Sequence, residues 1–295
     1  MISPQLDFTA WFVMQGTIAA MHQPQWQSQA NDNALSFMLP LAEEAKKSRP
    51  ISRLIHALPY KLQYCIGDMV TNRGRLRHFY LRKKEIEAQA LALLAKGDIT
   101  QVIVLGAGMD VLSLRLSKTY PEIKFIEIDL PESQLFKANA LATHQIEYPK
   151  NSELISGDLR NPLKDILAAS TLYDPQVKTL WIAEGLLMFI PEDSVLRITK
   201  EIKERSAADS YFIFTTLPTI KQTTILAYLL QSFYLKKENC PYEWVIPFTQ
   251  VKEFMHNAGY ELINQKDFSD LHRDYIGCQA GVLGEAVHIA QIGSE

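Results

Sequence analysis

A glycine-rich loop follows the first strongly apolar run of the chain. Gly106 and Gly108 come directly after residues 100–105 (TQVIVL) and before an apolar helical pattern. Glycines at such a junction let the backbone approach a bound cofactor closely. The dinucleotide fingerprint requires a further Gly or Ala three residues after the second Gly, where this chain has Val111. The loop therefore favours a smaller nucleoside over a dinucleotide.

Acidic residues end the next three apolar runs. Asp129 lies 23 residues after Gly106, close to the separation of about 20 at which an acid binds ribose hydroxyls. Asp158, followed by Leu159, would suit the exocyclic amine of an adenine ring. Glu184 is a lone charge in an apolar run, so it needs a cation, a hydrogen-bond donor or water. A sulfonium ligand would meet that need.

An alternation of strands and helices must position these loops. Apolar, β-branched runs predict strands that are buried on both faces, as parallel strands are, at residues 100–105, 124–128, 153–156, 179–183 and 211–217. Helical patterns are expected at residues 85–96, 110–118, 135–144, from 191 onward and from a cap at Thr249. Residues 261–266 and 286–291 predict a closing strand pair. The pattern predicts an α/β fold with a mainly parallel, doubly wound, Rossmann-like sheet, which binds ligands beyond the carboxyl ends of its strands.

Two regions lie outside this alternation. Residues 1–84 are expected to form a helical cap, and residues 85–295 the cofactor-binding domain. Residues 218–248 interrupt that domain with an apolar stripe at helical spacing. The stripe predicts either a helix that faces the core or a lid over the substrate.

Composition and charge exclude several classes of protein. The 295 residues are 47% hydrophobic and 21% charged, with a net charge of −3, which disfavours a nucleic-acid binder. Three dispersed cysteines disfavour a disulfide scaffold and a zinc module. The apolar stretch near the N-terminus has no basic region before it, and it is too short to span a bilayer. We expect a cytoplasmic protein without a metal, nucleic-acid or membrane partner, and the oligomeric state stays open.

Basic residues are concentrated in one part of the chain. Eleven of the thirty Lys and Arg residues fall between Lys46 and Lys84, and only Asp68 opposes them. Such a run forms either a solvated helical face or a site for an anion.

Four segments in this order resemble the leucine carboxyl methyltransferase family, whose members share the class I S-adenosylmethionine-dependent methyltransferase fold. They are LGAGMD (105–110), FIEIDLP (125–131), GDLR (157–160) and AEGLLMFIP (183–191). The segment from Asn72 to Gly74 resembles the one that precedes the family's cofactor-binding arginine, which spacing places at Arg82, with Arg77 as the fallback. The family commonly has Asp-Thr where this chain has Asp110-Val111.

The resemblance implies S-adenosylmethionine as the cofactor and S-adenosylhomocysteine as the product. It implies that Arg82 holds the methionine carboxylate and that Gly106 and Gly108 pass close to the cofactor. It also implies that Asp129 binds the ribose, that Asp158 and Leu159 frame the adenine, and that Glu184 faces the amino group or the sulfonium.

Methyl transfer to an oxygen is the predicted reaction, with a carboxylate of a small organic acid, polyketide-type or similar, as acceptor. A carboxylate is ionised at neutral pH and needs no general base, so alignment supplies much of the catalysis and no catalytic residue is named. Arg73, Arg75 and Arg77 are candidates to hold the acceptor anion. A hydroxyl acceptor would need a base, for which His78, His144, His256 and His272 are available by residue type alone.

Three other functions remain open. One is methylation of a protein's C-terminal leucine carboxylate, which the resemblance also implies. The others are an NAD(P)-dependent oxidoreductase and a non-catalytic nucleoside-binding protein on the same scaffold.

Overall fold

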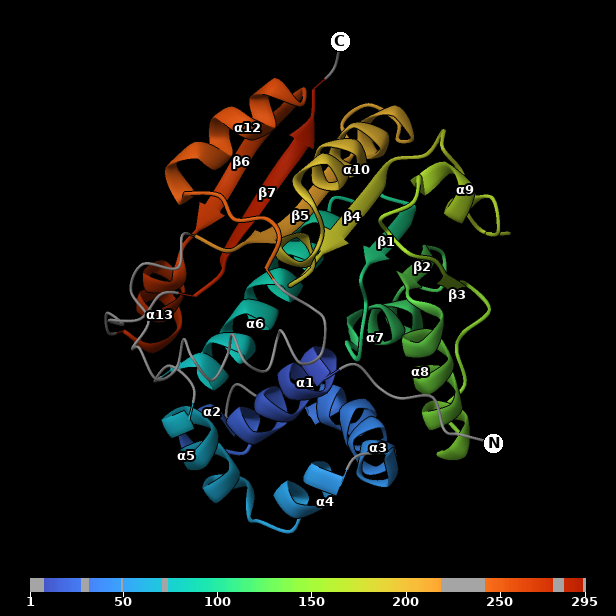
Figure 1. Ribbon diagram of the computed structural model, residues 1–295. Coiled ribbons are helices and arrows are strands. Elements are labelled where there is room, and N and C mark those ends of the chain that lie inside the picture. Colours follow the sequence, from blue (N-terminus) through green and yellow to red (C-terminus); the bar gives the residue numbers. More distant parts are fainter. Residues whose placement is uncertain are drawn as a thin grey trace.

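A seven-stranded sheet with the order β3-β2-β1-β4-β5-β7-β6 forms the centre of the computed structural model (Figure 1). The structure describes residues 8–27, 32–48, 50–70, 74–218, 242–277 and 284–293. The first five strands are parallel, and β7 runs antiparallel between β5 and β6. The strands are β1 (Gln101–Leu105), β2 (Lys124–Asp129), β3 (Ser152–Ser156), β4 (Thr179–Ala183), β5 (Tyr211–Thr216), β6 (Tyr260–Lys266) and β7 (Ala286–Ile292). The predicted fold class and the closing strand pair are confirmed.

Helices cover both faces of the sheet, which explains why its central strands are apolar throughout. Every residue of β1, β4 and β5 is buried. Alternate residues of β1 point into two separate cores, Val102 and Val104 into one and Ile103 and Leu105 into the other. The first core contains α6 (Arg75–Leu94), α7 (Leu112–Thr119) and α8 (Pro131–Thr143), and the second contains α9 (Leu163–Leu167), α10 (Glu192–Glu204) and α12 (Val251–Asn257).

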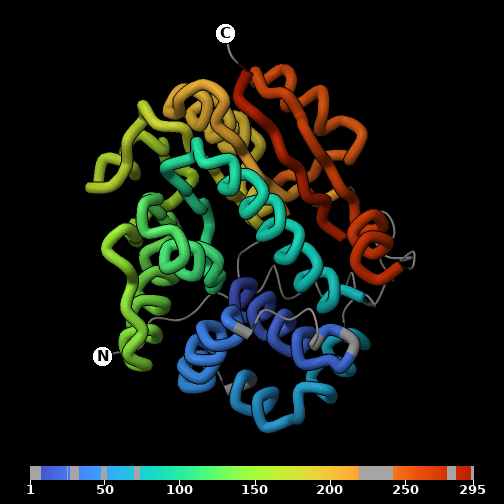
Figure 2. Tube along the Cα trace, turned by 180° about the vertical axis from the view of Figure 1, so that it is seen from behind, coloured from blue at the N-terminus to red at the C-terminus, as the bar shows by residue number. Residues whose placement is uncertain are grey.

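A layer of helices lies at one end of the sheet (Figure 1). Its members are α1 (Phe8–Met21), α2 (Pro24–Gln27), α3 (Asp32–Ser48), α4 (Pro50–His56) and α5 (Tyr60–Val70). Helix α1 packs on α6 so closely that a Cβ on Gly16 would come within 2.7 Å of the Leu76 side chain. Figure 2 shows α6 running from this layer along the sheet. All the elements described before residue 75 are helical, as a helical cap requires.

Helix α6 begins ten residues before the helix predicted at residue 85. The boundary expected after residue 84 therefore lies inside one continuous helix. The first turns of α6 are buried on several sides, at Leu76, Tyr80 and Arg82 among others. A helix buried in this way has no single apolar stripe, so its periodicity gives little signal.

The C-terminal region corrects one detail of the prediction. Thr249 does not cap a helix, because residues 248–250 form a 3-10 turn and α12 begins at Val251. The predicted stripe of residues 226–234 falls within residues 219–241, outside the described residues. The chain continues through α13 (Phe268–Ile276) to β7. Among the described residues, no helix is both long and apolar enough to cross a membrane.

Candidate functional site

The carboxyl ends of β1 and β2 meet around a hydrogen-bonded loop, as predicted. The Gly108 amide donates to Asp129 Oδ2 at 2.6 Å, and the Leu130 amide donates to Asp129 Oδ1 at 2.6 Å. Gly106 and Gly108 have φ values of +63° and +48°, in the left-handed region that favours glycine. A Cβ on Gly106 would also lie 2.7 Å from Leu186 Cδ1. The loops after β1, β2 and β4 therefore pack together at one edge of the sheet.

Arg82 connects this edge to helix α6 through two carboxylates. Its Nε and Nη2 donate to Glu184 Oε1 at 3.0 and 2.8 Å, and its Nη1 donates to Glu285 Oε2. The side chains of Arg82 and Glu184 are only 3% and 8% exposed. The cation that the lone charge of Glu184 requires is thus supplied within the chain.

Lys83 adds a second cation and a third carboxylate to the cluster. Its Nζ lies 3.0 Å from Glu184 Oε1 and 3.4 Å from Asp110 Oδ1. Two cations, Arg82 and Lys83, face three carboxylates, those of Asp110, Glu184 and Glu285. The cluster therefore has one surplus negative charge, which a ligand with one surplus positive charge would balance.

Attraction to neighbouring opposite charges keeps Arg82, Lys83 and Asp110 ionised despite their burial. Burial lowers the pKa of Arg82, but Glu285 and Glu184 outweigh that effect and raise it. Burial likewise opposes the charge of Lys83, yet Asp110 and Glu184 raise its pKa. For Asp110, burial raises the pKa, and Lys83, Lys137 and Arg115 more than reverse this, lowering it to about 2. Arg82, Lys83 and Asp110 are therefore charged at neutral pH.

Asp158 and Leu159 lie after β3 in a more open setting. Arg160 donates to both Asp158 oxygens, from Nε at 3.0 Å to each and from Nη2 to Oδ2 at 2.7 Å. This hydrogen bonding is the main reason that the pKa of Asp158 is lowered. The Leu159 side chain is 5% exposed and packs into the second core. Asp158 therefore keeps an ionised carboxylate at the surface, whereas Leu159 has only its backbone at the loop.

The candidates for holding an acceptor anion lie at the start of α6. Neither Arg75 nor Arg77 forms a salt bridge with another described residue. Arg77 Nε is buried and has no hydrogen-bond partner within the described ranges. Arg75 lies two helical turns before Arg82 on the same face of α6, whereas Arg77 is rotated away by about 140°. Arg73 lies outside the described residues.

Sequence reasoning missed the roles of Glu285 and Lys83. Glu285 immediately precedes β7, and an antiparallel strand begins at the edge where its parallel neighbours end. The predicted closing strand pair was the one signal that could have placed Glu285 there. The Glu285 amide also donates to His78 Nε2 at 2.9 Å. Burial lowers the pKa of His78 well below its usual value, so this histidine is a neutral acceptor.

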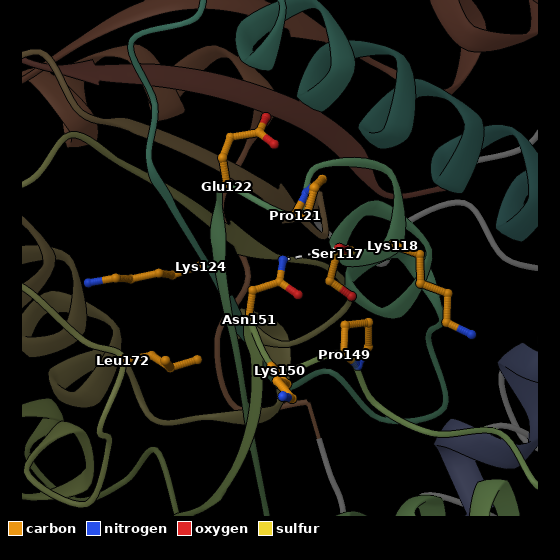
Figure 3. A pocket seen from close by; sticks show the side chains of 9 residues that line it. All are labelled: Ser117, Lys118, Pro121, Glu122, Lys124, Pro149, Lys150, Asn151 and Leu172. Carbon is orange, nitrogen blue, oxygen red and sulfur yellow. Dashed lines mark hydrogen bonds between the residues drawn. The ribbon is translucent and has the colours of Figure 1, made fainter.

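An open hollow of about 630 Å³ lies at the opposite, amino-terminal edge of the sheet (Figure 3). Lys118, Lys124 and Lys150 line it together with Glu122. The Asn151 side-chain amide, which also lines the hollow, donates to the carbonyl oxygens of Ser117, Tyr120 and Ile123. Within the described ranges, no group of three or more His, Cys, Asp or Glu side chains is arranged to hold a metal ion.

Comparisons with known proteins agree with this arrangement. A family model described as leucine carboxyl methyltransferase matches residues 13–203. A Streptomyces avermitilis protein, provisionally named an S-adenosyl-L-methionine-dependent methyltransferase, is 38% identical over 113 residues, which cover 38% of this chain and 39% of that protein. A Frankia alni protein with a similar provisional name is 34% identical over 131 residues, 44% of each chain. The chain thus spans about two-fifths of the length of the curated relatives it matches.

Solved structures with the same arrangement of elements are distant in sequence. A structure from Thermobifida fusca, provisionally named a methyltransferase, has a TM-score of 0.61 and 14% identity and covers 86% of this chain and 94% of that one. A DUF574 family protein from Streptomyces avermitilis has a TM-score of 0.57 and 16% identity, covering 79% and 91%. At such identities the likeness shows the fold alone.

Proposed function

We propose that this chain, which belongs to the leucine carboxyl methyltransferase family, transfers a methyl group from S-adenosylmethionine to a carboxylate of a small organic acid. One observation carries the proposal. The cluster of Arg82, Lys83, Asp110, Glu184 and Glu285, whose side chains are 3–20% exposed, has one surplus negative charge beside the glycine loop. S-adenosylmethionine carries an ammonium, a sulfonium and a carboxylate, so its surplus is one positive charge.

The chemistry of the side chains fits each part of that cofactor. The guanidinium of Arg82 has five N–H donors, of which the contacts with Glu184 and Glu285 use three. The remaining two would hold the methionine carboxylate. Glu184 and Asp110 would hold the ammonium group, because both carboxylates lie in the cluster with surplus negative charge.

The nucleoside would be held by the next two loops. Asp129 accepts the amides of Gly108 and Leu130, and its carboxylate would also accept the ribose hydroxyls, because an ionised carboxylate offers about four acceptor sites. Asp158 would accept from the adenine amine, and the backbone of Leu159 would border the ring. When bound, the cofactor supplies an electrophilic methyl group on its sulfonium.

A carboxylate acceptor agrees with the surroundings of the site. It is already ionised at neutral pH, so the protein has only to hold and desolvate it. Arg75 and Arg77 form no salt bridge with the described residues, unlike Arg82 and Lys83. An unpaired guanidinium binds a carboxylate bidentately, and Arg75 lies on the face of α6 that carries Arg82. His78 cannot act as a base there, since its Nε2 already accepts the Glu285 amide.

Ligand-induced thermal stabilisation tests the cofactor. We expect S-adenosylhomocysteine and S-adenosylmethionine to raise the melting temperature of the chain, and NAD and NADP to leave it unchanged, because bound ligand stabilises the folded state. Stabilisation by NAD alone would overturn the proposal in favour of an oxidoreductase.

Radiolabelled methyl transfer tests the acceptor. The chain is incubated with methyl-labelled cofactor and a panel of small carboxylic acids, and separately with a peptide that ends in leucine. We expect label in an alkali-labile ester of a small acid. Label on the peptide alone would instead identify a protein carboxyl methyltransferase, and cofactor binding without transfer to any acceptor would indicate a nucleoside-binding protein.

A further inference from the structure

Lys137 is a fully buried cation on α8, with no exposed surface. Its Nζ lies 2.5 Å from Glu127 Oε2, and it also donates to the carbonyl oxygen of Asp110. Glu127 is itself 1% exposed in the middle of β2. One ammonium group therefore joins a helix, a strand and the loop that follows Gly108.

Packing alone does not require this ion pair. Removing two charges from water costs several kcal/mol, and apolar residues of similar size often replace a buried pair without loss of stability. Burial raises the pKa of Glu127 even though Lys137 lowers it. Lys137 also donates a hydrogen bond to the Asp110 carbonyl oxygen, which an apolar residue at this position could not do.

Asp110 is the junction between this pair and the cofactor site. Its Oδ1 accepts the amides of Val111 and Leu112, at 2.6 and 3.3 Å, at the start of α7. The same oxygen lies 3.4 Å from Lys83 Nζ, which in turn contacts Glu184. The carbonyl held by Lys137 and the carboxylate facing Lys83 belong to one residue, so fixing the first constrains the second.

The buried charges consequently form one chain of alternating sign. It passes from β2 to the start of β7 through Glu127, Lys137, Asp110, Lys83, Glu184, Arg82 and Glu285. Glu127 and Glu285 end the chain, and every member between them has an oppositely charged residue on both sides.

We propose that Lys137 is a positioning residue for the cofactor site: by holding the Asp110 carbonyl beside Glu127, it sets where the Asp110 carboxylate meets Lys83 and hence where Glu184 and Arg82 lie. The inference rests on the proposed function, because it takes this cluster to bind S-adenosylmethionine. Lys137 does not touch the cofactor and acts through Asp110.

Two variants separate positioning from simple structural support. Lys137→Met removes the ammonium but leaves Glu127 buried without its partner, so both stability and cofactor affinity should fall. Glu127→Gln/Lys137→Met removes both charges, which should return most of the lost stability. It does not restore the bond to the Asp110 carbonyl. Lys266→Met is the matched control, because Lys266 pairs with Glu85 at 3.0 Å outside the chain of charges.

The readouts are the melting temperature and the dissociation constant of S-adenosylhomocysteine, measured by calorimetry on the full chain. We expect the double variant to melt close to the wild type and to bind S-adenosylhomocysteine at least tenfold more weakly. The Lys266→Met control should bind within twofold of the wild type. Recovery of affinity together with melting temperature in the double variant would show a structural role alone and overturn the inference.

A second measurement decides the matter if the double variant does not fold. Lys137→Gln and Asp110→Asn interrupt the same chain at two adjacent members, the first without leaving an apolar side chain beside Glu127. Groups that act in series show non-additive losses, so combining the two should weaken binding little more than either alone, and fully additive losses overturn the inference. A wild-type chain that does not bind S-adenosylhomocysteine overturns the proposed function itself, which distinguishes the two failures.

Discussion

The two edges of the sheet hold their charged residues in opposite ways. At the carboxyl edge, Arg82 and Glu184 are buried and bonded to each other. At the amino edge, Lys118 and Lys150 are exposed around an open hollow (Figure 3). A neutral amide at this edge, Asn151 Nδ2, is half-buried and donates to the carbonyl oxygens of Ser117, Tyr120 and Ile123 at 2.8–3.1 Å.

Neutral hydrogen bonds are therefore enough to close the turns of this fold. At the amino edge, the Asn151 amide makes neutral hydrogen bonds, and the ion pair of Lys178 with Asp98 lies at the surface, with the Asp98 side chain 46% exposed. The carboxyl edge instead buries charges, which cost several kcal/mol each to remove from water. Burying charges at this cost gives an advantage only where a ligand must interact with them. The contrast supports the proposal that the carboxyl edge binds the ligand and that the amino edge serves chain closure.

Arg82→Met should reduce the free energy of unfolding more than any other substitution considered. A small reduction would contradict the contrast between the two edges. The substitution leaves Glu184 and Glu285 buried without the cation between them, and a buried pair broken in this way costs about 3–5 kcal/mol. We expect the free energy of unfolding, measured in urea, to fall by that amount. A loss below about 1 kcal/mol would show that water already reaches the cluster.

Asp129→Asn should mainly reduce cofactor affinity. An amide can replace only one of the two carboxylate oxygens that accept the Gly108 and Leu130 amides, and its NH₂ group would face a donor. We expect S-adenosylhomocysteine to bind about 30- to 100-fold more weakly, equivalent to about 2–3 kcal/mol, as measured by calorimetry. Equal affinity in the variant would remove Asp129 from the proposed ribose site.

Most of the fold could be predicted from the sequence, because buried parallel strands leave a strong signal. The five predicted parallel strands lie within one or two residues of β1–β5. Helix α6 begins ten residues before its predicted start. Its first turns bury Arg82 beside apolar residues, and a buried charge disrupts the amphipathic pattern by which helices are recognised.

The part of the site that could be predicted is the set of loops that follow the parallel strands, because the order of the strands brings them to one edge. Gly108 and Asp129 meet at the edge where β1 and β2 end, as the order of the strands predicts. The pairing of Arg82 with Glu184 was not predicted, because the resemblance assigns each of them to a different part of the cofactor. Glu285 meets Arg82 across 203 residues of sequence, and no local pattern specifies such a partner. Lys137 in turn occupies an ordinary helical position in the sequence, and only the packing of α8 on β2 reveals that it is buried.

Acid should weaken the carboxyl edge through Asp110. Its pKa is about 2 in the folded chain, against about 3.9 for an unfolded aspartate. A carboxyl with a lowered folded pKa stabilises the fold above its unfolded pKa, and this contribution is lost as the pH falls through the folded value. Between pH 5 and pH 2, the free energy of unfolding should therefore fall by up to about 2 kcal/mol more in the wild type than in Asp110→Asn. Parallel pH profiles for the two chains would contradict this.

Arg75→Ala should affect the acceptor and not the cofactor. If the Arg75 guanidinium holds the acceptor carboxylate, its loss should raise the KM for the acid about tenfold, equivalent to about 1.4 kcal/mol. The affinity for S-adenosylhomocysteine should stay within twofold of the wild type. Arg77→Ala and Arg73→Ala test the other two candidates, and Lys61→Ala, an exposed cation on α5, is the control. An unchanged KM in all three arginine variants would place the acceptor elsewhere.

Lys150→Ala should have the smallest effect, and it tests the other side of the comparison. Lys150 is exposed at the amino edge, and it forms no salt bridge with the described residues. Exposed substitutions of this kind change stability by less than about 0.5 kcal/mol. We expect both the free energy of unfolding in urea and the affinity for S-adenosylhomocysteine to match the wild type. A loss of affinity here would mean that the two edges are coupled through the sheet, because no chain of charges like that at the carboxyl edge connects Lys150 with Arg82 within the described residues.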